Sequence, residues 1–141
     1  MSVDAGLSLQ LSCKNGLRSI VQALLSSEWG PHAEGWHCVP LDQDTSEWTL
    51  LGNNSREIEM LFSAKMAAKQ VFGIRLWWKG GETGGEFLVF ESGEIVFSPT
   101  TNRVTLDGRV TDVSWYLERL LPVFQRSPGV VVDNWAWRET S

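Results

Sequence analysis

The chain has 141 residues, of which 43% are hydrophobic and 21% are charged, and this balance predicts a globular domain and excludes an intrinsically disordered chain. Its twelve Lys and Arg residues and seventeen Asp and Glu residues give a net charge of −5. That charge argues against a nucleic-acid partner, because phosphate binding needs concentrated positive charge. No stretch approaches the roughly 18 uninterrupted apolar residues of a membrane span, and the N-terminal segment lacks a basic region followed by an apolar one. We therefore expect one domain over residues 1–141 of a cytoplasmic protein, with no membrane partner.

The first third of the chain predicts a strand, a helix and two short strands. Residues 7–12 alternate between leucine and polar side chains, which is the period of a half-buried strand. From Leu17 to Leu25 the apolar residues follow helical spacing and predict the first helix. Residues 29–43 contain two Gly and two Pro residues and are expected to be mostly loop, with a short strand near 36–39. A further strand is expected over residues 47–51.

A second helix is expected from about Ser55 to Gln70. Asn54 followed by Glu57 three residues later resembles a capping box with Asn as the cap, and the following residues are strong helix formers. Asn54 therefore marks the start of this helix.

The rest of the chain predicts strands, then a helix, then a strand. Residues 71–78, 86–92 and 94–98 are rich in aromatic and branched side chains, and the first two are joined by a Gly-rich turn. Thr111 or Asp112 is expected to cap a third helix that Pro122 ends or kinks. Residues 130–137 form the last predicted strand.

These elements predict an α+β fold with the order β-α-β-β-α-β-β-β-α-β. The connections between the middle strands are too short for parallel crossovers, so we expect a mainly antiparallel sheet of about six to seven strands with three helices packed on it. The helical spacing predicts that eight residues are buried: Leu17, Ile20, Leu24, Leu61, Phe62, Leu117, Leu120 and Leu121.

No residue set has the signature of a catalytic or metal site. His32 and His37 with Cys38 lack the paired close spacing of a zinc site, so exposed or packed histidines are the simpler interpretation. The Gly-rich stretch 80–85 lacks the Lys-Ser/Thr ending of a phosphate-binding loop and is followed by a strand. Cys13 and Cys38 are interpreted as reduced thiols. We expect no catalytic residue, no metal and no cofactor, and we expect a protein that is not an enzyme.

The acidic residues are concentrated in one stretch. Residues 19–55 contain no Lys or Arg and five acidic residues, so this stretch alone carries a charge of −5. One interpretation is an ordinary solvated surface. The other is an anionic, Trp-containing surface that attracts a basic protein. The partner-binding candidates of this second interpretation are Glu34, Trp36, Asp42, Asp44, Glu47 and Trp48.

Trp115 offers a second candidate surface. It lies about 200° around the predicted third helix from the apolar position Val113, so it is expected to lean away from the core beside Glu118 and Arg119. Contact with another protein is one interpretation, and cover by a neighbouring loop or strand is the other. With eight Trp residues in the chain, most must be core residues.

Two segments of this small acidic α+β chain carry a resemblance: GIRLWWKGGETGG followed by EFLVFESGEIVFSP, and TDVSWYLERLLP near the end. In them the chain resembles bacterial immunity proteins of the contact-dependent growth inhibition and polymorphic-toxin type. The resemblance implies a cytoplasmic antidote that binds a cognate toxin domain, a nuclease for example, and blocks its active site. Two other functions stay open: an adaptor, chaperone or phage-type accessory domain, and a small enzyme that uses the Gly-rich hairpin. The sequence also leaves the formation of a homo-oligomer open.

Overall fold

The computed structural model describes residues 4–140 of the chain. In chain order its elements are β1 (Asp4–Cys13), α1 (Arg18–Leu25), β2 (Trp29–Gly30), β3 (Trp36–Cys38), β4 (Thr49–Leu51), α2 (Ser55–Ala67), β5 (Phe72–Trp78), β6 (Gly84–Val89), β7 (Glu94–Thr101), β8 (Thr105–Leu106), β9 (Val110–Thr111), α3 (Val113–Gln125) and β10 (Val130–Thr140).

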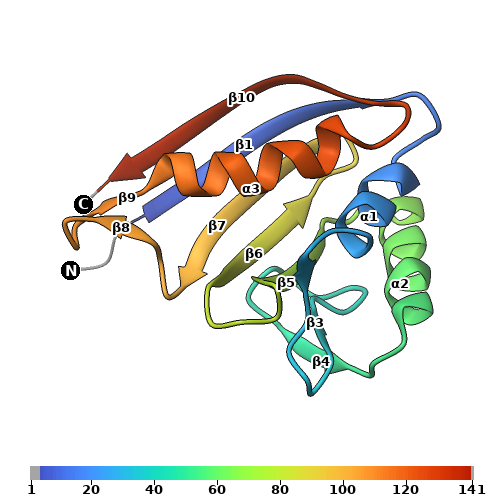
Figure 1. Cartoon of the computed structure of the whole chain (residues 1–141). Coiled ribbons are helices and arrows are strands. Elements are labelled where there is room, and N and C mark those ends of the chain that lie inside the picture. The colour runs from blue at the N-terminus through green and yellow to red at the C-terminus, as the bar shows by residue number, and fades with distance from the viewer. Residues whose placement is uncertain (1–3, 141) are drawn as a thin grey trace.

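Eight of the strands form one antiparallel sheet (Figure 1). Their order is β10-β1-β7-β6-β5-β3-β4, with β2 paired to β5, while β8 and β9 form a separate hairpin. The predicted α+β fold, its three helices and its mainly antiparallel sheet are confirmed. Strands β2, β8 and β9 were not predicted, because a two-residue strand is too short to show a period of two.

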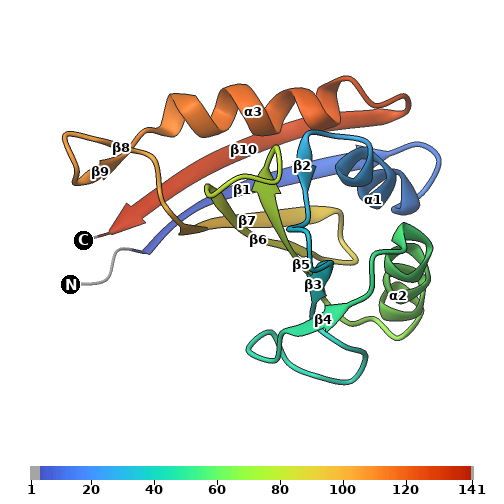
Figure 2. The same ribbon diagram turned by 60° about the horizontal axis from the view of Figure 1, so that its bottom comes forward.

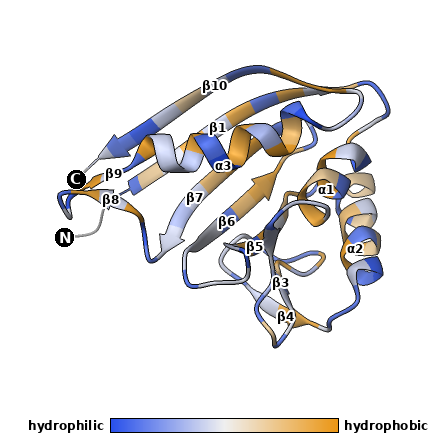
Figure 3. Cartoon of the chain, viewed as in Figure 1, coloured by the Kyte–Doolittle hydropathy of each residue, from blue (hydrophilic) through white to orange (hydrophobic). Residues whose placement is uncertain are grey.

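The core lies between one face of the sheet and the helices. Figures 1 and 2 show α3 running along the sheet over β1 and β10, with α1 beside it and α2 next to α1. Buried residues of all three helices join the inward residues of the strands in one cluster. The alternation that produces this face is visible along β1 in Figure 3, where Leu7, Leu9 and Leu11 are buried and Ser8 and Gln10 are partly exposed.

The predicted core positions lie in or against this cluster. Ile20, Leu24, Phe62 and Leu120 are fully buried. The other four, Leu17, Leu61, Leu117 and Leu121, are partly buried and pack against the cluster. None of the eight is exposed.

The helix ends follow the predicted caps with two differences. Asn54 accepts a hydrogen bond from the Arg56 N–H, and Asp112, not Thr111, caps α3 by accepting from the Trp115 N–H. Helix α2 ends at Ala67, three residues before its predicted end. Pro122 does not end α3, which continues to Gln125. The φ angle of proline is compatible with a helix and only its N–H is missing, so packing of the flanking turns through buried residues carries the helix past it.

Candidate functional site

Three exposed carboxylates lie in the acidic loop, which we define as residues 40–48 between β3 and β4. Asp42 adopts φ of 66°, and its N–H donates to the Gln70 Oε1 at 2.8 Å while Gln70 Nε2 donates to the Asp42 Oδ1 at 2.7 Å. The Asp44 carboxylate accepts from the N–H and the hydroxyl of Ser46, and the Glu47 N–H donates to the Asp44 carbonyl. These bonds set the backbone of the loop and leave its carboxylates in water.

The hydrogen bonds from Ser46, side chain first and backbone second, lower the pKa of Asp44 below its ordinary value. Both bonds favour the charged form of the carboxyl group. Asp44 therefore stays negatively charged at neutral pH.

Trp48 fixes the other end of the loop on the sheet face that the helices leave uncovered. A Cβ atom placed on Gly73 would lie 3.2 Å from Cη2 of Trp48, so the ring occupies space that only a glycine leaves free. The Arg75 guanidinium covers the ring at 4.4 Å from its centroid and pairs with Glu86 at 3.0 Å. Trp48 is thus an anchor of the loop, and its ring is partly exposed.

Lys65 is a buried cation near the acidic loop. Its side chain is fully buried in α2 and its Nζ has no hydrogen-bond partner among the described residues. Burial lowers the pKa of Lys65, while the Asp42 carboxylate, and Cys38 in its ionised form, oppose this shift. Burial also raises the pKa of the Cys38 thiol to about 12, with Lys65 opposing, so Cys38 is not a nucleophile at neutral pH.

Two of the six residues predicted for the partner surface lie elsewhere. Trp36 is only 8% exposed and packs in the core, because Trp36 and Cys38 point to the inner face of β3 and His37 points to the outer face. Its assignment to the surface does not fit the structure. Glu34 is exposed but precedes β3, so it lies at the opposite end of the β3–β4 pair from the acidic loop. Asp42, Asp44, Glu47 and Trp48 are the four that the fold brings together.

The expectation that Trp115 leans away from the core is wrong. Its ring is partly buried against the core, with centroids 4.9 Å from Tyr116, 6.3 Å from Trp78 and 6.5 Å from Trp29. The rings of Trp29 in β2 and Trp78 in β5 lie beside the Trp115 ring, so the structure supports the second interpretation, in which neighbouring strands cover Trp115. Of its predicted companions, Glu118 is exposed and Arg119 lies over the Trp115 ring at 4.1 Å.

The two histidines and the Gly-rich turn have packing roles. His32 stacks on Trp77 at 3.7 Å and bonds the Gly81 carbonyl, and the ring of His37 lies 5.7 Å from that of Trp77. A Cβ atom on Gly84 would lie 2.5 Å from Cδ1 of Trp77, so this glycine makes room for the indole ring. Within residues 4–140 no group of His, Cys, Asp and Glu side chains could hold a metal ion.

Gln70 and Gly73 are the site residues that the sequence did not indicate. Gln70 contributes through its hydrogen bond with Asp42, which lies 28 positions earlier in the chain, and no local sequence pattern predicts such a contact. Gly73 did leave a signal, since a glycine inside a strand often marks a place where another group approaches the backbone closely.

Among the described residues no helix is long and apolar enough to cross a membrane. Comparison of the chain with protein-family models, with curated proteins and with solved structures found no match.

Proposed function

We propose that this protein binds a basic protein domain through its acidic loop, and that it serves as an immunity protein that neutralises a cognate bacterial toxin. The observation that carries the proposal is the set of three exposed carboxylates, Asp42, Asp44 and Glu47, on a loop whose two ends are anchored. This loop lies in the stretch 19–55, which contains five acidic residues and no basic one. The stretch 80–102 also has four acidic residues and no basic one, but one of them, Glu86, pairs with Arg75.

The anchoring of the acidic loop is a second feature, beside its charge, that supports binding. A loop already held by Gln70 and by Trp48 loses less conformational freedom when a partner docks, and this raises affinity without a new contact. Exposed charges act mainly on the association rate, because they steer an oppositely charged partner over about 8 to 10 Å before contact.

The toxin role rests on the resemblance to immunity proteins and on the sign of the charge. A nuclease is the toxin type that an acidic inhibitor suits best, since its substrate cleft is basic. An inhibitor that occupies such a cleft keeps nucleic acid out of it.

Rescue of growth tests the proposed function. The protein is co-expressed with the C-terminal domain of the product of the adjacent gene, and the expected result is that cells survive this domain only when the protein is present. Purified proteins should then form one tight complex. Unhindered growth with that domain alone, or capture of several unrelated clients in its place, would contradict the toxin role and favour a chaperone.

Charge removal in the acidic loop tests the surface. The variant Asp42→Asn, Asp44→Asn, Glu47→Gln keeps the size of each side chain and removes three negative charges. We expect its association rate with the toxin domain to fall about tenfold at low ionic strength. The matched control Glu82→Gln, Glu91→Gln, Asp107→Asn removes three exposed charges elsewhere.

The control should change the rate by less than about twofold, because a charge far from the interface is screened. Stopped-flow measurements at low and high salt provide the comparison. Equal rates for the two triple variants would remove the acidic loop from the interface.

A further inference from the structure

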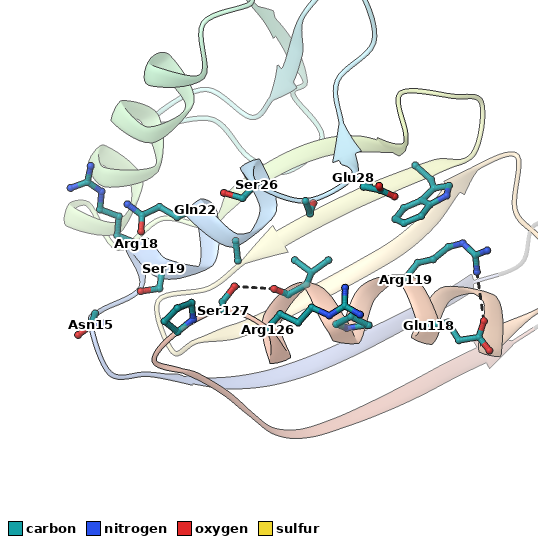
Figure 4. A pocket seen from close by; sticks show the side chains of 16 residues that line it. Asn15, Arg18, Ser19, Gln22, Ser26, Glu28, Glu118, Arg119, Arg126 and Ser127 are labelled. Carbon is teal, nitrogen blue, oxygen red and sulfur yellow. Dashed lines mark hydrogen bonds and ion pairs between the residues drawn. The ribbon is translucent and has the colours of Figure 1, made fainter.

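A groove of about 870 Å³ runs between α1 and α3 (Figure 4). Three arginines and two glutamates, Glu28 and Glu118, line it, so its net charge is positive in a chain that is negative overall. Arg119 and Arg126 project from α3, and Arg18 lies on α1 across the groove. We call this feature the arginine groove. It is distinct from the acidic loop and shares no residue with it.

Arg119 is held in place before any ligand arrives. Its Cζ lies 4.1 Å from the Trp115 ring centroid and 5.5 Å from that of Trp78, and its Nη1 donates to the Trp115 carbonyl at 3.0 Å. The Trp29 indole N–H donates to the Arg119 carbonyl at 2.9 Å, which ties this turn of α3 to the core. A guanidinium oriented in this way loses little freedom on binding an anion.

Within residues 4–140, two of the three arginines of the groove have no acidic partner, and the third has a weak one. A guanidinium has five N–H donors, and Arg119 uses one of them for the Trp115 carbonyl, while its Nε is buried with no partner among the described residues. Arg119 forms an ion pair with the exposed Glu118 at 3.9 Å, a separation too long for a hydrogen bond (Figure 4). Among the described residues neither Arg126 nor Arg18 makes an ion pair.

The spacing of these arginines selects the kind of ligand. Arg126, the cap residue at the end of α3, follows Arg119 by seven residues, so their Cα atoms lie about 10.5 Å apart along the helix axis and on the same side of it. A single phosphate is too small to meet both. A peptide in the polyproline II conformation rises about 3.1 Å per residue and presents every third side chain on one side, which places two such side chains about 9 Å apart. Two carboxylates at that separation match the two arginines.

We propose that the arginine groove binds an acidic peptide segment of a partner protein that carries two carboxylates three residues apart. One carboxylate pairs with Arg119, and the other pairs with Arg126. This site requires a partner of the opposite charge to the one that suits the acidic loop, so it stands whether or not the protein neutralises a toxin.

Fluorescence anisotropy with a synthetic probe tests the proposal. The probe is a short labelled peptide with two Asp residues three positions apart in an Ala and Pro background, and the comparison peptide carries Asn in their place. We expect binding of the Asp peptide only. Arg126→Gln should weaken it about tenfold or more, because a charged hydrogen bond is lost. Arg126 is exposed, so this change leaves the fold intact.

The matched control is Arg56→Gln, which removes an exposed arginine from α2 outside the groove and should change the affinity less than twofold. The variant with the three neutralised acidic-loop residues should bind the peptide at least as tightly as the unchanged protein. Equal affinity for the Asp and Asn peptides, or for Arg126→Gln and the unchanged protein, would overturn the proposal.

Two further results would also overturn it. One is binding of single-stranded RNA, sensitive to Arg126→Gln, with no binding of the Asp peptide. The other is self-association in sedimentation that Arg126→Gln abolishes, since this would assign the groove to the acidic loop of a second copy.

Discussion

The acidic loop and the arginine groove carry opposite charge, and the fold holds them in different ways. The loop takes its charges from residues 42–47, which are neighbours in the chain, and it is held by two amide hydrogen bonds and one indole ring on the surface of the sheet. The groove takes its arginines from residues 18, 119 and 126, and the tryptophans that orient Arg119 belong to or pack on the core. The geometry of the groove is therefore coupled to global stability far more than that of the loop.

The largest expected effect is a loss of stability when Trp29 is removed, because Trp29 supports the helix turn that carries Arg119 of the arginine groove. This side chain is 1% exposed, and its ring meets Phe87, Phe97 and Trp78 while its N–H holds the Arg119 carbonyl. Trp29→Ala should lower the free energy of unfolding by about 3 to 5 kcal/mol, because a large cavity opens. Urea denaturation followed by circular dichroism measures this loss.

The control for Trp29→Ala is Trp135→Ala, which removes an indole that is 45% exposed on the edge strand β10. Its cost should stay under about 1 kcal/mol. A similar loss of stability in both variants would show that Trp29, and with it the support of the Arg119 turn, contributes no more to the core than an exposed tryptophan does.

The second prediction loosens the acidic loop and leaves the groove untouched. A Cβ atom on Gly73 would lie 2.9 Å from the Val39 side chain and 3.2 Å from those of Trp48 and Leu88, so Gly73→Ala overpacks this point. We expect a loss of about 1 to 3 kcal/mol and displacement of the Trp48 ring. Loss of contacts between Trp48 and Arg75 in the spectrum of the variant, by nuclear magnetic resonance, would report the displacement.

The control is Gly30→Ala, because a Cβ atom on Gly30 would meet no atom within 4 Å and the φ of Gly30 lies outside the left-handed region. Gly80→Ala is unsuitable as a control, because Gly80 has φ of 66°, which strains any other residue. Gly30→Ala should leave the Trp48 signals unchanged. Unchanged signals in Gly73→Ala as well would mean that Trp48 does not depend on the space at Gly73.

The same contrast explains what the sequence could predict. The strand period of β1, the caps Asn54 and Asp112, and the charge of the acidic loop are local patterns, and each was visible before the structure was known. The placement of Trp115 was missed because it depends on Trp29 and Trp78, which come from distant strands. The arginine groove had no local pattern at all, since its two walls are about 100 residues apart in the sequence.

The assignment of Trp36 failed for a different reason. A strand at residues 36–39 was expected, and its period of two places Trp36 and Cys38 on one face. Only the neighbouring strand β5 decides that this face is the inner one, so a correct strand prediction was not enough to place the indole ring. Local periodicity groups side chains by face, and tertiary pairing decides which face is buried.

The smallest expected effect concerns Lys65, the buried cation near the acidic loop, and here a substitution should stabilise the protein. Its Nζ is buried and has no hydrogen-bond partner within residues 4–140, and a buried donor left unpaired costs at least about 1 kcal/mol. Lys65→Met keeps the length of the side chain and removes the amine, so we expect it to raise the free energy of unfolding by about 1 kcal/mol at pH 7. Thermal unfolding of the two proteins side by side measures the difference.

The pH dependence of that difference identifies its cause. Burial lowers the pKa of Lys65 below 10.5 in the folded state, so between this folded pKa and pH 10.5 the unfolded chain binds more protons at this residue than the folded protein does. The destabilising contribution is therefore fully present below the folded pKa, and it disappears as the pH rises through the folded pKa toward 10.5. The pKa of Cys38, about 12 with Lys65 present, rises further in Lys65→Met, so this thiol stays protonated in both folded proteins up to pH 10.5. The stability gap between the two proteins should therefore narrow over this range. A gap that stays constant with pH would attribute the gain to better packing of the methionine, and it would show that the buried charge of Lys65 does not destabilise the folded protein.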